Sequence, residues 1–133
     1  HYYYHKFDPG DQKSHRRSIY RFVVRSQPNP FMTTLDCADS SQSTPRRNET
    51  LTALQALSLL NNKFTLSMSQ QFAERLTNEV SGMENQVRAG FELVTGRSPN
   101  TEEHRLLLEY ADKHGTPNLC RSLFSLSEFA FID

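Results

Sequence analysis

Apolar and polar positions change their spacing along the chain near residue 50. From there on, apolar residues recur every three or four positions, the period of a helix with one buried face. The pattern predicts helices at about 50–60, 65–80, 84–95 and 100–114, and a fifth that starts at Pro117 and ends in an apolar run at 129–132. Because the connections are short, neighbouring helices should be antiparallel. We therefore expect a mainly α fold, a bundle-like domain of about five helices.

Helix-terminating residues support these boundaries. Thr52 and Gln55 have the spacing of a capping box, in which each side chain satisfies a free backbone donor at the helix start, and Asn100 and Glu103 repeat it. Gly96 follows the third predicted helix, and a second glycine, Gly115, follows the fourth. Residues 50–133 are therefore predicted to form the helical core.

The first predicted helix is apolar over most of its circumference, which predicts that it is the buried central helix. Its polar residues form a single stripe of Thr52, Gln55, Ser58 and Asn62, and Asn61 lies beside its end. Two arginines, Arg46 and Arg47, come just before this stripe.

Two interpretations of this stripe remain open. Together with Arg46 and Arg47, it could bind a carboxylate or a sulfate, because guanidinium groups present a planar fork of donors to oxyanions. Alternatively, it hydrogen-bonds the N-terminal residues, whose backbone groups need partners if they pack on a core. We favour the second interpretation, because a polar stripe on one helix is a weak signal.

Residues 1–49 are predicted to form a long irregular or partly extended arm that packs on the core. Prolines and glycine interrupt any helical run there. Within the arm, residues 18–25 are rich in β-branched and aromatic residues, so a short strand competes with a two-turn helix, and we favour the extended form. Arg16, Arg17, Arg21 and Arg25 would form a basic edge in either geometry, with Asp36 and Asp39 as natural ion-pair partners.

The 133 residues carry no net charge, with 15 Lys or Arg against 15 Asp or Glu, so no global field attracts nucleic acid. The charges are unevenly distributed, however. Residues 1–47 carry eight basic against four acidic residues, +4, and residues 48–133 carry seven against eleven, −4. The two halves should therefore attract each other or a second domain.

No stretch has the roughly 20 apolar residues that a membrane span requires, so we expect no membrane insertion.

Recognisable catalytic or cofactor-binding motifs are missing from the sequence. The five histidines lack the spacing of a metal site, and we expect no metal and no cofactor in these residues. Whether the chain contributes to an enzyme is left open. The two cysteines, Cys37 and Cys120, could form one disulfide in an oxidising compartment, or could both remain free.

Residues 45–62, PRRNETLTALQALSLLNN, resemble the signature of the planctomycete "PSD-one" family, a C-terminal domain of unknown function. Further stretches on both sides of it also match, in the order in which the family has them: RRSIY at 16–20, LDCAD at 35–39, FAER at 72–75, GRSPNTEE at 96–103 and LCRSLF at 119–124. The resemblance implies that the chain is the last portion of a large exported protein with a cytochrome c-like domain upstream. Any haem would then belong to upstream domains, and the location would be extracytoplasmic.

These observations lead to two functional expectations. The first is a structural or interaction module whose partners are other domains of the same parent chain. The alternative is one wall of an enzyme or binding site for an acidic or sulfated polysaccharide. Its candidate binding residues are Arg46, Arg47, Gln55, Asn61, Asp36 and Asp39.

Overall fold

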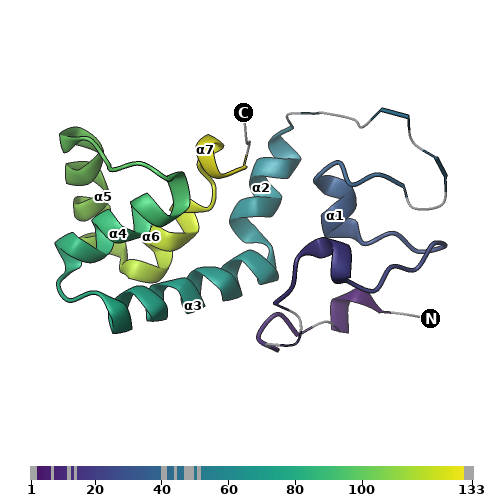
Figure 1. Ribbon diagram of the computed structural model, residues 1–133, viewed down its shortest axis with the longest axis horizontal. Coiled ribbons are helices and arrows are strands. Elements are labelled where there is room, and N and C mark those ends of the chain that lie inside the picture. The colour runs from purple at the N-terminus through teal and green to yellow at the C-terminus, as the bar shows by residue number, and fades with distance from the viewer. Residues whose placement is uncertain are drawn as a thin grey trace. The chain divides into compact units, whose positions relative to one another are not determined.

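The computed structural model describes residues 3–6, 8–11, 13, 15–39, 42–43, 45–46, 50 and 52–130. The helices in chain order are the 3-10 turns η1 (Tyr4–Lys6) and η3 (Ser18–Tyr20), then α1 (Pro30–Thr34), α2 (Ala53–Asn61), α3 (Lys63–Glu79), α4 (Met83–Thr95), α5 (Thr101–His114), α6 (Thr116–Leu123) and α7 (Ser127–Ala130) (Figure 1). The described residues form no strand and contain only an isolated bridge between Val24 and Gln27. The mainly α fold is confirmed.

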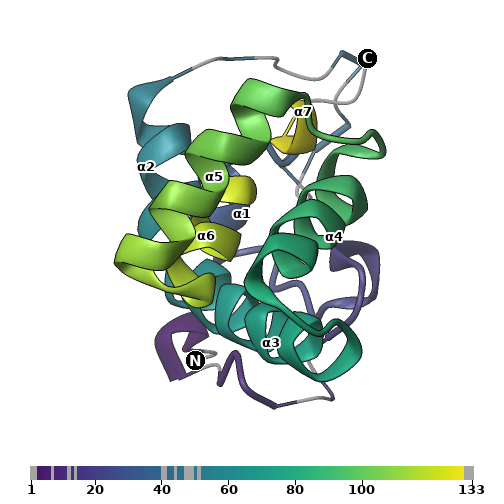
Figure 2. The ribbon, with the colours of Figure 1, turned by 90° about the vertical axis from the view of Figure 1, so that its left-hand side faces the viewer.

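The chain divides into two compact units, residues 1–58 and residues 59–133, and the division falls inside α2. The second unit holds α3 to α7, and α6 is its central helix. This helix packs against α3, α4 and α5, and the two views of the ribbon show it enclosed by them (Figures 1 and 2). Three of its side chains, Leu119, Cys120 and Leu123, are completely buried.

The core of the second unit is built on the two faces of α6. On one side a cluster joins α4, α5 and α6 through Val87, Phe91, Ala111, Leu119 and Leu123. On the other side Ala73 and Leu76 of α3 pack with Cys120. Gly90 of α4 lets α3 approach closely, because a Cβ atom there would lie 3.0 Å from Leu76 Cδ1.

The predicted position of the first long helix as the buried centre is wrong. On α2, Leu54 is 60% exposed and Leu57 is 55% exposed, and Gln55 is the one buried residue of that helix. A helix that is apolar on all sides is buried only if neighbours surround it. The helices α3, α4 and α5 surround α6 instead. The apolar residues of α6 face these three helices.

Helix termini follow local capping chemistry more closely than the apolar periodicity. The helix predicted from residue 65 begins two residues earlier, because Asn62 Oδ1 accepts a hydrogen bond from Phe64 N at 2.9 Å and caps α3. The single helix predicted after Pro117 is divided into α6 and α7 by a turn after Leu123. Of the apolar ending predicted at 129–132, residues 131–132 lie outside the described residues.

The first unit contains more helix than the sequence predicted. The α1 helix begins at Pro30, where proline was taken as a helix breaker. Asn29 caps this helix by accepting hydrogen bonds from Phe31 N and Met32 N. Proline is tolerated in the first turn of a helix, because an N–H group there has no carbonyl partner within the helix. The extended form favoured for residues 18–25 is also wrong at its start, where the 3-10 turn η3 lies.

Cys37 and Cys120 are both free. Cys37 is exposed, whereas Cys120 is buried among apolar side chains, and this burial raises the pKa of its thiol to about 12. A thiol with that pKa stays protonated at neutral pH and packs as a small apolar group. Among the described residues, every helix is too short or too polar to span a bilayer.

Candidate functional site

A hydrogen-bonded cluster of Asp36, Thr50 and Gln55 links the end of α1 to the start of α2 within the first unit. Thr50 N donates to Asp36 Oδ2 at 2.7 Å, and Thr50 Oγ1 lies 2.9 Å from Asp36 Oδ1. Gln55 Nε2 donates to the same Asp36 Oδ2 at 3.0 Å and to Thr50 Oγ1 at 2.9 Å. The Thr50 hydrogen bonds, and after them that of Gln55, lower the pKa of Asp36 below its ordinary value.

The backbone around Asp36 holds this carboxylate in place. Asp36 has a φ of 56°, the left-handed conformation that aspartate tolerates better than most residues. Its N–H donates to Thr33 O at 3.2 Å, and the N–H of Cys37 donates to Met32 O at 3.0 Å. These two bonds form a Schellman motif, which satisfies the last carbonyls of α1. The termination of α1 therefore orients the Asp36 side chain.

Gln55 uses its whole side-chain amide inside this cluster. Its oxygen accepts from Thr52 N at 2.9 Å, while Thr52 Oγ1 accepts from Gln55 N at 3.2 Å, so the predicted capping box is present. Its nitrogen has two hydrogens, and Asp36 and Thr50 accept both. Gln55 therefore has no donor left for an external ligand.

The other end of the polar stripe is bound by Arg121 of α6, within the second unit. Arg121 Nε donates to Leu60 O at 2.7 Å, and Nη2 donates to Asn61 Oδ1 at 2.6 Å. A guanidinium group at the end of a helix satisfies carbonyls that have no helical donor and interacts favourably with the helix dipole. Asn61 and Arg121 thus close the C-terminal end of α2.

The remaining predicted site residues lie elsewhere or outside the description. Arg46 is exposed, and Arg47 lies outside the described residues. Asp39 Oδ2 accepts a hydrogen bond from Gln42 Nε2 at 3.2 Å. Of the six candidates, the structure brings together Asp36 and Gln55 and bonds Asn61 to Arg121.

Sequence reasoning missed a charged cluster around Arg97. This guanidinium group bonds Glu103 in a two-pronged arrangement, Nη1 to Oε2 at 2.9 Å and Nη2 to Oε1 at 2.8 Å, and reaches Glu128 Oε1 at 3.0 Å. It also lies 4.8 Å from the centre of the Phe91 ring. The cluster connects the end of α4 with the start of α5 and with α7. Its signal in the sequence is the Gly96–Glu103 stretch, where Arg97 precedes Glu103 by six positions.

Arg97 and the helix cap together shift the ionisation of Glu103. The Arg97 hydrogen bonds, together with one from Asn100 N, lower the pKa of Glu103 to about 2. The same carboxylates raise the pKa of Arg97. Both groups therefore stay charged throughout the physiological pH range.

These clusters are suited to holding helix ends rather than to catalysis. A general base needs a pKa near the working pH, and that of the Asp36 carboxylate is lowered instead. Thr50 Oγ1, which lies against this carboxylate, also accepts a hydrogen bond from Gln55. Across the described part of the chain, no three histidine, cysteine or acidic side chains are grouped as they would be around a metal ion.

The family comparison covers most of the chain. A family model described as PSD1, protein of unknown function (DUF1553), matches residues 3–111. Searches of curated proteins and of solved structures found no match. The matched range includes the Asp36–Gln55 cluster, the polar stripe and the Arg97–Glu103 pair. The chain therefore belongs to the PSD1 family of proteins of unknown function (DUF1553).

Proposed function

We propose that the chain is a structural and interaction module that packs against other domains of the same, longer, exported polypeptide. In this proposal the polypeptide works outside the cytoplasm, and any haem it holds is bound by domains outside residues 1–133. The module has no catalytic role of its own. Its contribution is a helical surface on which neighbouring domains are held.

The exposed apolar face of α2 carries this proposal. Leu54 and Leu57 lie about one helical turn apart and are 60% and 55% exposed. Burying a leucine side chain contributes about 1.5–3 kcal/mol, so two exposed leucines on one helix leave a large stabilisation unused. Within the first unit, Gln55 fixes the N-terminal end of α2 through its bonds to Thr52 and Asp36. A helix fixed in this way presents its leucines to a partner with little further loss of entropy.

The polysaccharide alternative has less support. Its four main binding candidates were Arg46, Arg47, Gln55 and Asn61. The Gln55 amide is saturated by Thr52, Asp36 and Thr50, and the Asn61 oxygen accepts from Arg121. A sulfate or carboxylate at Gln55 would have to break the bonds of its amide nitrogen before it gained new ones.

The experiment compares two matched variants in an association assay. The chain is titrated by calorimetry into the remainder of its natural polypeptide, expressed separately. Leu54→Ser with Leu57→Ser should weaken association by at least about tenfold, the loss expected from about 1.4 kcal/mol, because the variant removes apolar area from the interface. The control is Leu106→Ser on α5, a leucine of similar exposure in the second unit.

Equal affinity for wild type and the α2 double variant would contradict the proposal, as would a complete lack of association. An equal loss in the Leu106→Ser control would show that any exposed leucine contributes, and that α2 is not the docking face. Circular dichroism of each variant checks that the helices remain. A sulfated glycan that bound wild type and lost affinity on Arg46→Ala would support the polysaccharide alternative instead.

A further inference from the structure

The arm contains a long stretch without any acidic residue. Between Asp11 and Asp36 the chain carries five basic residues, Lys13, Arg16, Arg17, Arg21 and Arg25, and no aspartate or glutamate. A run of this kind produces a local positive potential even though the whole chain is neutral. We call residues 15–25 the basic segment.

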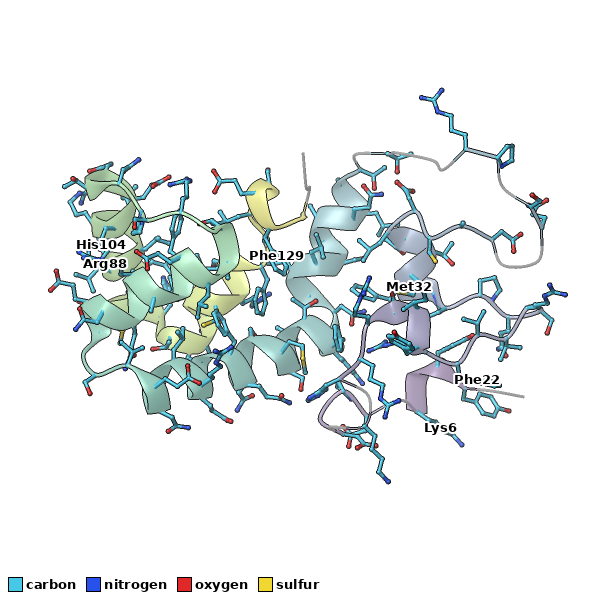
Figure 3. The ribbon with its side chains drawn as sticks, viewed as in Figure 1. Lys6, Phe22, Met32, Arg88, His104 and Phe129 are labelled. Carbon is cyan, nitrogen blue, oxygen red and sulfur yellow. The ribbon has the colours of Figure 1, made fainter. Side chains whose placement is uncertain are left out.

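Large apolar side chains are exposed in the middle of the basic segment. Ile19 is 76% exposed, Tyr20 70%, Phe22 68% and Val23 57%. Figure 3 labels Phe22 among the side chains of this segment. Single exposed apolar residues are common, but four within five consecutive positions form a patch of the kind that marks interaction sites.

Backbone hydrogen bonds hold the basic segment in this conformation. The η3 turn is closed by Tyr20 N, which donates to Arg17 O at 2.9 Å, and Gln27 N, just after the segment, donates to Val24 O within it at 3.1 Å. From η1, the Tyr4 hydroxyl accepts from Val24 N at 3.3 Å. The apolar side chains are therefore exposed by a defined backbone, and binding through them needs less ordering than binding through an unstructured loop.

The cations of this segment are suited to carboxylates. Arg16, Arg17 and Arg25 are exposed, and none of them forms an ion pair with a carboxylate of the described residues. All the cations from residue 14 to residue 62 are arginines. Guanidinium groups pair with carboxylates through two parallel hydrogen bonds, which an ammonium group cannot do. Arginine, tyrosine and phenylalanine are also enriched in protein interfaces, where lysine is depleted.

We infer that the basic segment is a docking surface for an acidic polypeptide whose carboxylates flank an exposed apolar side chain. The arginines would pair with the carboxylates while Ile19, Tyr20 and Val23 cover the apolar group. This inference rests on the proposed function and names a second contact surface of the module, apart from α2. A nucleic acid or a sulfated polysaccharide could also pair with the arginines and stack on Tyr20, but neither needs Ile19 and Val23, and an anionic membrane surface attracts lysine as well as arginine.

The test uses synthetic probes of defined chemistry. The main probe is a fluorescein-labelled peptide in which pairs of glutamates alternate with single leucines, and its control has serine in place of leucine. Two further arms use heparin, and vesicles of phosphatidylcholine with phosphatidylglycerol. Fluorescence anisotropy measures peptide binding, with heparin as competitor, and co-sedimentation measures vesicle binding.

Wild type should bind the leucine peptide about tenfold more tightly than the serine peptide. This is the difference expected if one or two leucine side chains of the peptide become partly buried. Arg16→Lys with Arg17→Lys and Arg25→Lys keeps the charge but should lose about tenfold, because the paired hydrogen bonds are lost. Ile19→Ser with Val23→Ser should abolish the preference for leucine. Arg46→Lys, outside the segment, is the matched control and should bind as wild type does.

Three results would overturn the inference: no peptide binding, equal binding of both peptides, or full affinity in the triple lysine variant. Vesicle or heparin binding stronger than peptide binding would assign the segment to a membrane or a polyanion instead. The outcomes are separable from those of the proposed function. If the peptide fails while Leu54 and Leu57 still govern association with the parent polypeptide, the inference about the basic segment is wrong and the proposed function stands.

Discussion

The Gln55 side-chain nitrogen lies 3.0 Å from Asp36 Oδ2 and joins residues that are 19 positions apart in sequence. The bond connects the first turn of α2 with the turn that ends α1. Thr50 completes the cluster through its backbone N–H and its hydroxyl group. Because the carboxylate gathers several donors from one short stretch, this relationship sets where α2 begins relative to α1.

Replacing Gln55 by glutamate should destabilise the first unit more than replacing it by alanine. Alanine removes the cap to Thr52 N and the bonds to Asp36 and Thr50, a loss of about 1–2 kcal/mol in the free energy of unfolding. Glutamate keeps the cap to Thr52 but places a second carboxylate against Asp36. Urea unfolding of both variants at neutral pH measures the difference. A glutamate variant as stable as wild type would contradict this account of the cluster.

Glu103→Gln should remove part of the pH dependence of stability. In the folded state the pKa of Glu103 is about 2, against an ordinary value of 4.5. A carboxyl group whose pKa is lowered on folding contributes stability above its unfolded pKa, and this contribution is lost as the pH falls through the folded value. Wild type should therefore unfold at a higher temperature than Glu103→Gln at neutral pH. The difference in unfolding temperature between the two proteins should become smaller as the pH falls from 4.5 to about 2.

The control for this experiment is Glu109→Gln. That carboxylate also contacts an arginine, Arg105, but at 3.4 Å in an exposed pair on one helix, which contributes little. The control should leave the pH profile of thermal unfolding unchanged. A gap between wild type and Glu103→Gln that stays constant with pH would contradict the shifted ionisation.

Leu76 and Gly90 should show strong energetic coupling. Leu76→Ala should cost about 2–5 kcal/mol, because this α3 side chain is completely buried and packs with Cys120 of α6. Gly90→Ala places a methyl group 3.0 Å from Leu76 Cδ1, so overpacking of about 1–3 kcal/mol outweighs the helical preference for alanine of about 1 kcal/mol. In the Leu76→Ala background the same methyl group enters the vacated space. A double-mutant cycle with purely additive energies would contradict this packing.

Arg121→Ala should destabilise the second unit by about 1–2 kcal/mol, because Leu60 O and Asn61 Oδ1 lose their donor. Asn61→Ala removes only one of the two bonds and should cost less. Thermal unfolding of both variants, with Arg88→Ala as a control for loss of an arginine, measures the order. If Asn61→Ala costs as much as Arg121→Ala, the carbonyl of Leu60 is not the main acceptor.

Capping residues predicted the helix boundaries well because caps act over a few positions. The Asn100–Glu103 box and the Thr52–Gln55 box both occur where their spacing predicted them. The same chemistry could have predicted α1 from Asn29 followed by Pro30. There the interpretation of proline as a breaker prevailed, although proline is favourable in the first turn of a helix.

The position of α2 and the partners of its polar stripe could not be predicted in the same way. A helix that is apolar on all sides is expected to be buried, but its sequence does not say which elements bury it. In the structure, Leu54 and Leu57 of α2 are exposed. The bonds from Gln55 to Asp36 and from Arg121 to Asn61 join positions 19 and 60 residues apart. Such pairings depend on tertiary packing, which the spacing along one helix does not encode.

Hydrogen exchange along α2 tests the central claim most directly. Exchange of the backbone amides is followed by mass spectrometry in the isolated chain and in the longer polypeptide of the proposed function. If α2 is a docking face, amides around Leu54 and Leu57 should exchange at least about tenfold more slowly in the full polypeptide, while those of the buried α6 change little. Equal exchange of α2 in the two samples would contradict the claim that the chain is an interaction module.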